Sequence, residues 1–165
     1  MSKWDNRFID LAKHIASWSK DRSTQVGAVA VGSLREIKSV GYNGFPRGVD
    51  DDIEERHERP AKYSFTEHAE RNLIYNATLN GISLNGTTLY VTHFPCPDCA
   101  RGVIQSGITR VYWAEDSSEE AKQFRERTYK SQLLSLEMLK EAEVACFFIK
   151  EDGTIIEAEK DHLLP

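Results

Sequence analysis

The order of helical and strand patterns along the chain predicts an α/β fold, a single domain with three layers. Short apolar runs alternate with amphipathic helical patterns in the order αββαβαβαβ, which predicts a mixed sheet of about five strands with helices on both faces. The 165 residues are 40% hydrophobic and 28% charged, as expected for one ordinary domain. We assign residues 1–150 to this domain and residues 151–165 to a C-terminal tail or an appended hairpin.

The N-terminal part is expected to form one helix and a two-stranded hairpin. Apolar residues recur at steps of three and four residues over residues 4–19, which predicts an amphipathic helix with Trp4 and Trp18 as core anchors. The small apolar run 26–31 predicts a buried strand, and residues 36–41 can return beside it.

The rest of the chain alternates helix and strand after a charged loop over residues 49–62. Thr66 is the expected N-cap of the first of these helices, and Pro97 is well placed to begin the second. The predicted elements, in chain order, are a helix 67–79, a strand 87–92, a helix 97–106, a strand 110–114, a helix 117–142 and a strand 144–149.

One histidine, one glutamate and two cysteines form the motif that indicates chemistry. His68 and Glu70 belong to His-Ala-Glu, and Cys96 and Cys99 belong to Pro-Cys-Pro-Asp-Cys. One imidazole and two thiolates are ligands that Zn²⁺ prefers, and three protein ligands leave a fourth position open for water, as in catalytic zinc sites. Glu70 follows the histidine by two residues, so its carboxylate can stand beside the metal and accept a proton from activated water.

A C-x-x-C motif also occurs in redox pairs and in closed zinc sites. A redox pair would leave His68 and Glu70 unexplained, and no thioredoxin-like βαβ pattern surrounds the cysteines. A closed site needs a fourth ligand, and the remaining candidates, Cys146 and the other histidines, stand in no paired spacing. The sequence therefore favours an open, catalytic zinc site.

Composition limits the partners and the compartment. A net charge of −5 and a pI of about 5.6 argue against nucleic acid as a partner, because binding its backbone needs clustered Lys and Arg. With two cysteines assigned to zinc, Cys146 has no disulfide partner, which favours a reducing, cytoplasmic location. No apolar run approaches the roughly 18 residues that span a membrane, so we expect no membrane partner.

Two polar segments are candidates for ligand contacts. Residues 19–25 combine Lys20 and Arg22 with three hydroxyls, Ser23 among them, a composition that suits a phosphate. A solvated loop with Ser and Thr turn chemistry explains the same composition equally well. Glycines on both sides of Asn43 indicate a turn that presents its side chain to a ligand, although Asn-Gly is also a common turn dipeptide.

The pattern His-x-Glu followed by Pro-Cys-x-x-Cys is typical of zinc nucleobase deaminases. Together with its flanks, it resembles the deoxycytidylate (dCMP) deaminases of the cytidine deaminase superfamily. The resemblance runs from about Ala16 to Tyr112 and fades beyond. It rests on residues 19–21, 25–28, 41–46, 68–72 and 90–96.

The resemblance implies a cytidine-deaminase-like fold and zinc-dependent hydrolysis of dCMP to dUMP and ammonia, which supplies precursor for dTTP. At matched positions it implies that His68, Cys96 and Cys99 hold the zinc and that Glu70 is the catalytic proton shuttle. It further implies a pyrimidine nucleotide as the small-molecule partner, with substrate contacts from Asn43, Ala69 and Pro95 and, for the phosphate, from Lys20, Arg22 and Ser23.

The family also suggests assembly and regulation. Relatives form homo-oligomers, hexamers among them, and some are regulated by dCTP and dTTP. We therefore expect a homo-oligomer, and we expect Mg²⁺ only together with an allosteric nucleotide.

Three features depart from the family pattern. Members commonly carry a second zinc site with cysteines before the His-Ala-Glu helix, but residues 49–65 contain no Cys, so we predict one catalytic Zn²⁺ per chain. A tyrosine that often helps to bind the phosphate is not evident after Trp113, and residues 116–130 resemble an insertion.

These departures keep other substrates open. The first alternative is another cytosine nucleotide, either 5-substituted dCMP or dCTP. A tRNA adenosine deaminase-like editing enzyme shares the core motif, but the acidic charge counts against it. A zinc-stabilised module that only senses nucleotides would have no use for Glu70.

Overall fold

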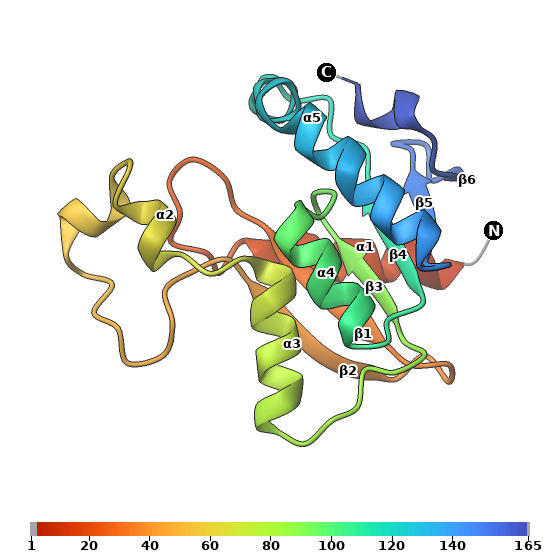
Figure 1. Ribbon diagram of the computed structural model, residues 1–165, viewed down its shortest axis with the longest axis horizontal. Coiled ribbons are helices and arrows are strands. Elements are labelled where there is room, and N and C mark those ends of the chain that lie inside the picture. The colour runs from red at the N-terminus through yellow and green to blue at the C-terminus, as the bar shows by residue number, and fades with distance from the viewer. Residues whose placement is uncertain (1–2, 165) are drawn as a thin grey trace.

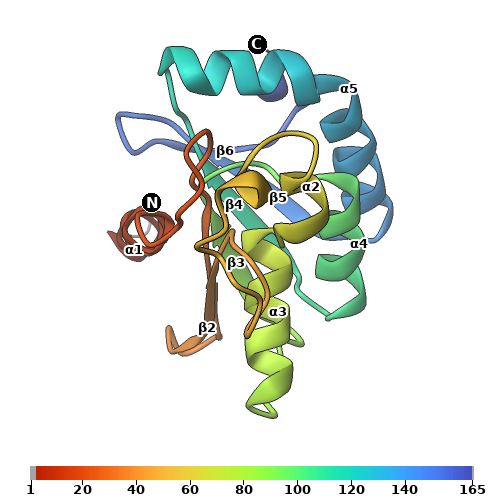
Figure 2. The same cartoon turned by 90° about the vertical axis from the view of Figure 1, so that its left-hand side faces the viewer.

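The computed structural model describes residues 3–164 and shows three layers built around one mixed sheet (Figure 1). Helix α1 (Lys3–Ala16) covers one face of the sheet, and α3 (Ala69–Leu79) and α4 (Pro97–Gln105) cover the other (Figure 2). The long helix α5 (Glu119–Glu141) packs beside α4. The predicted three-layer α/β fold is confirmed.

The sheet of the described residues has six strands in the order β2-β1-β3-β4-β5-β6. Strand β1 pairs antiparallel with β2 and β3, the β3–β4 and β4–β5 pairs are parallel, and β6 is antiparallel to β5. The strands are β1 Gly27–Val31, β2 Ile37–Tyr42, β3 Thr88–Val91, β4 Arg110–Ala114, β5 Ala145–Ile149 and β6 Ile155–Glu157.

Parallel pairing gathers the carboxyl ends of β3, β4 and β5 at one edge of the sheet, because crossover helices must carry the chain back between them. The segment that follows β3 leads into Cys96, and the segment that follows β4 leads into α5. The predicted count of about five strands was close, and β6 is the addition. It forms a hairpin with β5, and Ala158 and Leu163 beyond it are buried in the core.

Two hydrophobic clusters hold the layers together, one on each face of the sheet. Strand β1 is buried along its whole length and serves both clusters. Ala28 and Ala30 face α3, whereas Val29 and Val31 face α1. A slip of one residue would exchange these two sets, so the packing on both faces fixes the register of the central strand.

The first helix is shorter than predicted, and its tryptophans are not the core anchors that we expected. Helix α1 ends at Ala16, and Trp18 lies beyond it in a turn with 53% of its surface exposed. Trp4 is also partly exposed and stacks on Phe8, with the Arg7 guanidinium over its ring. The buried residues of α1 are Phe8, Ile9, Ala12, Ile15 and Ala16.

Helix α3 begins two residues later than predicted, with His68 as its N-cap in place of Thr66. The reason is a two-residue antiparallel bridge in which the backbones of Gly44 and Glu67 exchange hydrogen bonds of 3.0 and 2.8 Å. This bridge keeps Glu67 extended. Thr66 instead ends a short helix α2 (Lys62–Phe65), which follows the 3₁₀ turn η1 (Glu54–His57) in the charged loop.

The remaining helices agree closely with the sequence. Pro97 occupies the first turn of α4, and Ser118 caps α5 by accepting a hydrogen bond from the backbone N–H of Ala121. A second 3₁₀ turn, η2 (Lys160–Leu163), ends the described chain. Among the described helices, not one combines the length and the apolar composition needed to cross a bilayer.

Substitution of Gly41 tests how closely the sheet packs against α3. A Cβ at this position would overlap the backbone carbonyl of Ala69 and the backbone nitrogen of Leu73. We expect Gly41→Ala to lower the free energy of unfolding by about 1–3 kcal/mol through overpacking, measured by denaturant titration. Gly44→Ala is the matched control, because its nearest neighbour would be a Tyr42 ring carbon at 3.6 Å. Equal losses for both variants would contradict this account.

Candidate active site

The metal-ligand candidates come from the first turns of two helices. His68 is the N-cap residue of α3, Cys96 is the N-cap residue of α4, and Cys99 is two residues beyond Pro97, where α4 begins. Unpaired backbone N–H groups at a helix N-terminus favour negative charge nearby. Two such termini therefore converge where thiolates are needed.

The side-chain geometry fits a tetrahedral metal site. The Nδ1 atom of His68 lies 3.4 Å from Sγ of Cys96 and 3.5 Å from Sγ of Cys99. A tetrahedral zinc bound by one nitrogen and two sulfurs would place these atoms about 3.6 Å apart, given the usual bond lengths. Within residues 3–164, this cluster contains no fourth His, Cys, Asp or Glu. The arrangement matches an open site rather than a closed one.

The two thiols share a strongly coupled environment. Hydrogen bonds from Cys99 and His68 lower the pKa of Cys96 to about 4, although burial opposes this. The adjacent sulfur of Cys96, together with burial, raises the pKa of Cys99. Cys96 therefore loses its proton easily, whereas Cys99 keeps its proton until a bound cation stabilises both thiolates.

Glu70 is buried beside this cluster, with 4% of its surface exposed. It occupies the first turn of α3, so its carboxyl group lies at the same helix terminus as His68. Burial raises the pKa of Glu70, and the charge of His68 only partly offsets this. A raised pKa makes a carboxylate a stronger base, which suits a group that accepts a proton and later returns it.

A cavity of about 390 Å³ opens onto these groups, within the range of about 300–1,000 Å³ that is usual for small-molecule sites. Its wall includes Ala69, Ser23 and Asn43, three of the predicted substrate contacts, together with His68, Glu70 and Cys96. Pro95 is fully buried next to Cys96 and does not line the cavity.

The predicted phosphate contacts Lys20 and Arg22 do not reach this cavity. They line a second cavity of about 280 Å³, and acidic residues of the charged loop neutralise them. Lys20 Nζ lies 2.9 Å from Asp51 Oδ1, and Arg22 forms a two-pronged ion pair with Glu54. The sequence prediction did not foresee that the loop over residues 49–62 would fold back onto residues 19–25.

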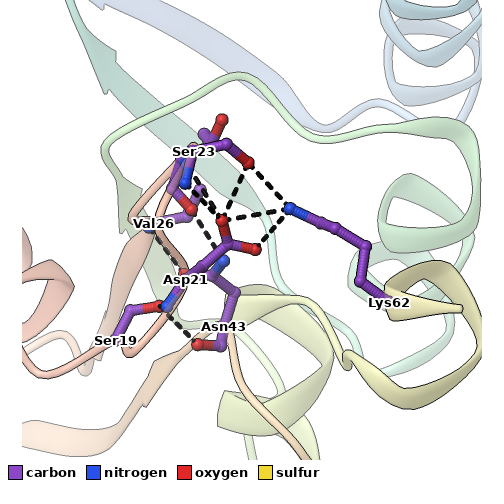
Figure 3. Close-up of polar contacts among 7 residues, drawn as sticks. Ser19, Asp21, Ser23, Val26, Asn43 and Lys62 are labelled. Atoms are coloured by element: carbon purple, nitrogen blue, oxygen red, sulfur yellow. Dashed lines mark hydrogen bonds and ion pairs between the residues drawn. The ribbon is translucent and has the colours of Figure 1, made fainter. Parts of the chain in front are cut away.

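Asp21 lies between Lys20 and Arg22 in the sequence. Its hydrogen bonds and ion pair hold together the cavity wall formed by residues 19–25 (Figure 3). Lys62 Nζ lies 2.8 and 3.1 Å from its two carboxylate oxygens and 2.7 Å from Ser23 Oγ. Backbone N–H groups of Ser23 and Thr24 donate to the same carboxylate. Burial alone would raise the pKa of Asp21, but these hydrogen bonds outweigh it and lower the pKa. The ion pair fixes residues 19–25 to α2.

Asn43 stabilises its turn through hydrogen bonds and also lines the cavity (Figure 3). Its Oδ1 accepts a 2.8 Å hydrogen bond from the backbone N–H of Val26, and its Nδ2 donates to the carbonyl of Thr24 at 2.8 Å. Ser19 Oγ donates to its backbone carbonyl at 2.7 Å. One amide hydrogen and one lone pair remain for a ligand.

Several residues of the cavity wall were missed by the sequence prediction. Helix α5 contributes a face that repeats at steps of three and four residues, namely Phe124, Arg127, Thr128 and Gln132. The segment around α2 contributes Arg59, Lys62 and Tyr63. On the sequence alone, this helical spacing also fits an ordinary amphipathic packing face, so it did not mark these residues as part of a site.

The geometry of this site agrees with the family and the relatives to which the chain is similar. Residues 2–115 match the family model described as the cytidine and deoxycytidylate deaminase zinc-binding region. An uncharacterized deaminase from the luxG 3′ region of Aliivibrio fischeri is 46% identical over 132 residues, which is 80% of this chain and 86% of the relative.

Two animal relatives are similar over a shorter share of their length. A probable deoxycytidylate deaminase of Drosophila melanogaster is 40% identical, over 74% of this chain and 64% of the relative. The human deoxycytidylate deaminase is 38% identical, over 69% of this chain and 66% of the relative. The chain therefore matches slightly less than two thirds of these two proteins.

A solved structure shares the fold. The dCMP deaminase of cyanophage S-TIM5, solved with dCMP and dUMP, superimposes with a TM-score of 0.69. The match covers 90% of this chain and 98% of the phage protein at 24% sequence identity.

The Asp21–Lys62 pair makes a testable contribution to stability. Asp21→Asn should cost about 3 kcal/mol at pH 7, because it leaves a mostly buried ammonium group without its partner. The pKa of Asp21 is lowered in the folded state, so the contribution is complete above the usual value of 3.8. It should disappear as the pH falls through the lower, folded-state pKa. Urea titrations of wild type and variant at several pH values measure this difference.

Asp51→Asn is the matched control for this ion pair. It breaks the exposed Lys20–Asp51 pair, which should contribute less than about 1 kcal/mol. If both variants lose equal stability at pH 7, the buried ion pair does not hold this wall.

Proposed function

Because the chain belongs to the cytidine and deoxycytidylate deaminase family, we propose that it hydrolyses dCMP to dUMP and ammonia. The observation that carries the proposal is the buried carboxyl group of Glu70, which shares one cavity with an open His-Cys-Cys cluster. A site that served structure alone would need neither the carboxyl group nor the open fourth position.

The residues that would hold zinc are His68, Cys96 and Cys99, whose spacing fits one tetrahedral ion. Zinc bound there supplies a Lewis acid that makes water nucleophilic at neutral pH. Glu70 would take a proton from a water molecule as the water oxygen bonds to C4 of the base, and would pass that proton to the ring nitrogen. It would then take the second proton from the oxygen on C4 and deliver it to the amine, which leaves as ammonia when the C4–N bond breaks. The helix N-termini favour the negative charge that develops on oxygen.

The cations of the cavity wall support a phosphate at the same site. Arg59 and Arg127 line the cavity, and neither forms an ion pair within the part of the chain that the structure describes. Lys62 is already shared between Asp21 and Ser23. We assign the 5′-phosphate to Arg59 and Arg127, in place of Lys20 and Arg22.

The base and the sugar have partners of suitable chemistry. Asn43 keeps free hydrogen-bonding capacity for a sugar hydroxyl, and Ala69 leaves room beside the metal ligands. The rings of His93 and Phe124 meet edge to face with centroids 4.9 Å apart and offer an aromatic wall for the base. Regulation by dCTP and dTTP, with Mg²⁺, and assembly into a homo-oligomer stay predictions.

A substrate panel tests the proposed function. Zinc-loaded protein is incubated with dCMP, CMP, dCTP, deoxycytidine and 5-substituted dCMP, and ammonia release is followed. Selective turnover of dCMP is the expected result. Preference for dCTP or for a 5-substituted base would keep the zinc chemistry and change the substrate. Silence with every compound, from protein shown to contain one zinc per chain, would overturn the proposal.

Glu70→Gln tests the proton shuttle. The amide keeps the shape of the side chain but cannot accept a proton, so we expect kcat for dCMP to fall by about 10²–10⁴-fold with zinc content unchanged. Zinc is measured by a chelator colour assay on the purified variant. Glu55→Gln, on the exposed charged loop, is the control and should retain activity. Near-normal turnover by the Glu70 variant would refute its assigned role.

Arg127→Met tests the phosphate assignment. Loss of one charge-assisted hydrogen bond should raise KM for dCMP by about tenfold or more, while the rate with deoxycytidine, which has no phosphate, should change little. Lys130→Met provides a control that removes a cation from an exposed position three residues away on α5. A parallel loss with dCMP and deoxycytidine would argue against a phosphate contact.

A further inference from the structure

Gln132 of α5 carries a buried acceptor for which residues 3–164 provide no hydrogen-bond partner. Gln132 lines the metal cavity and also a neighbouring cavity of about 310 Å³, and only 3% of the residue is exposed. Among the described residues, its Oε1 is a buried side-chain atom without a hydrogen-bond partner. An unsatisfied buried polar atom destabilises a fold, so its presence on a cavity wall points to a ligand group that satisfies it.

The orientation of this amide is determined by its neighbour. The other end of the side chain, Nε2, donates a 3.2 Å hydrogen bond to the backbone carbonyl of Phe94. A carbonyl oxygen can only accept, so the nitrogen must face Phe94 and the oxygen must face away from it. The free group of Gln132 is therefore an acceptor, and its ligand must offer an N–H or O–H donor.

The anchor places this acceptor at the metal end of the cavity. Phe94 precedes the ligand Cys96 by two residues, a chain separation of at most about 7 Å. Asn43, assigned to the sugar, comes from a different segment, between β2 and α2. The group of the substrate nearest to the metal ligands is the one that is replaced, which is the exocyclic amine at C4.

We propose that Oε1 of Gln132 accepts a hydrogen bond from the exocyclic amino group of a 4-aminopyrimidine nucleotide. This inference rests on the proposed function and makes Gln132 a specificity-determining residue of that reaction. The amine remains a donor until it leaves as ammonia, so the contact persists through the reaction.

The same contact separates substrate from product. In a uracil nucleotide, position 4 carries a carbonyl oxygen, which is an acceptor. Two acceptors facing each other repel, and neither can be satisfied by the other. Gln132 therefore favours the cytosine nucleotide over the uracil nucleotide and assists release of the product.

The test compares substrate and product on the zinc-loaded full chain. The two measured quantities are kcat/KM for dCMP and the inhibition constant of dUMP as a competitive inhibitor. Gln132→Met preserves the length of the side chain and removes the acceptor. Gln132→Glu keeps an acceptor oxygen in either protonation state. Gln123→Met makes the same change at an exposed position of the same helix and serves as the control.

We expect Gln132→Met to lower kcat/KM for dCMP by about tenfold, while dUMP binds as well as before or better. Gln132→Glu should retain the preference for the amino base, because an acceptor remains. Gln123→Met should match wild type in both quantities. Thermal unfolding of each variant reports any general loss of structure.

A parallel weakening of dCMP and dUMP in Gln132→Met would overturn the inference, since a packing or anchoring defect affects both. An unchanged ratio would overturn it as well and would mean that water satisfies the acceptor. Failure of the proposed function is distinguishable, because it appears as absence of dCMP turnover in the wild type.

Discussion

The extended backbone at Glu67 is the constraint on which the site depends. Its bridge to Gly44 prevents α3 from beginning earlier, so His68 becomes the N-cap with its imidazole free of the helix surface. Pro97 likewise determines where α4 begins, because it favours a helix start at the residue after Cys96. Two helix N-termini can then face one point.

Much of this arrangement was predictable because local rules decide it. The five predicted strands lie within one or two residues of the observed ones, since apolar runs and turn residues leave little choice. The metal cluster was equally accessible, because His68, Cys96 and Cys99 stand in a short motif that is typical of zinc sites and lie together in the structure. Trp18 was misassigned because the apolar spacing continues past Ala16, where the helix ends, so Trp18 lies in an exposed turn.

The substrate pocket was less predictable, since its wall is assembled from segments that are distant in sequence. Lys20 and Arg22 look like phosphate ligands until the acidic loop folds back and neutralises them. Arg127 and Gln132 belong to a helix whose pattern fits simple amphipathic packing, and only the tertiary structure turns this face toward the metal. The catalytic chemistry of a short motif can be inferred from sequence, whereas substrate specificity that depends on how distant segments pack together cannot.

The difference between the predictable metal ligands and the less predictable pocket wall suggests how the site is built. The metal ligands and Glu70 lie on short helical turns supported by the central sheet, where small shifts meet backbone atoms such as those around Gly41. The wall contributed by α5 is a single helical face, capped by Ser118 and anchored near the metal ligands by the bond from Gln132 to Phe94. On the proposed function, the residues of that face meet the base and the phosphate together with Arg59 and Asn43, whereas the metal ligands belong to other elements. The sheet and two helix N-termini then hold the reacting groups, and the proposed choice of nucleotide depends on how α5 and the neighbouring loops pack over them.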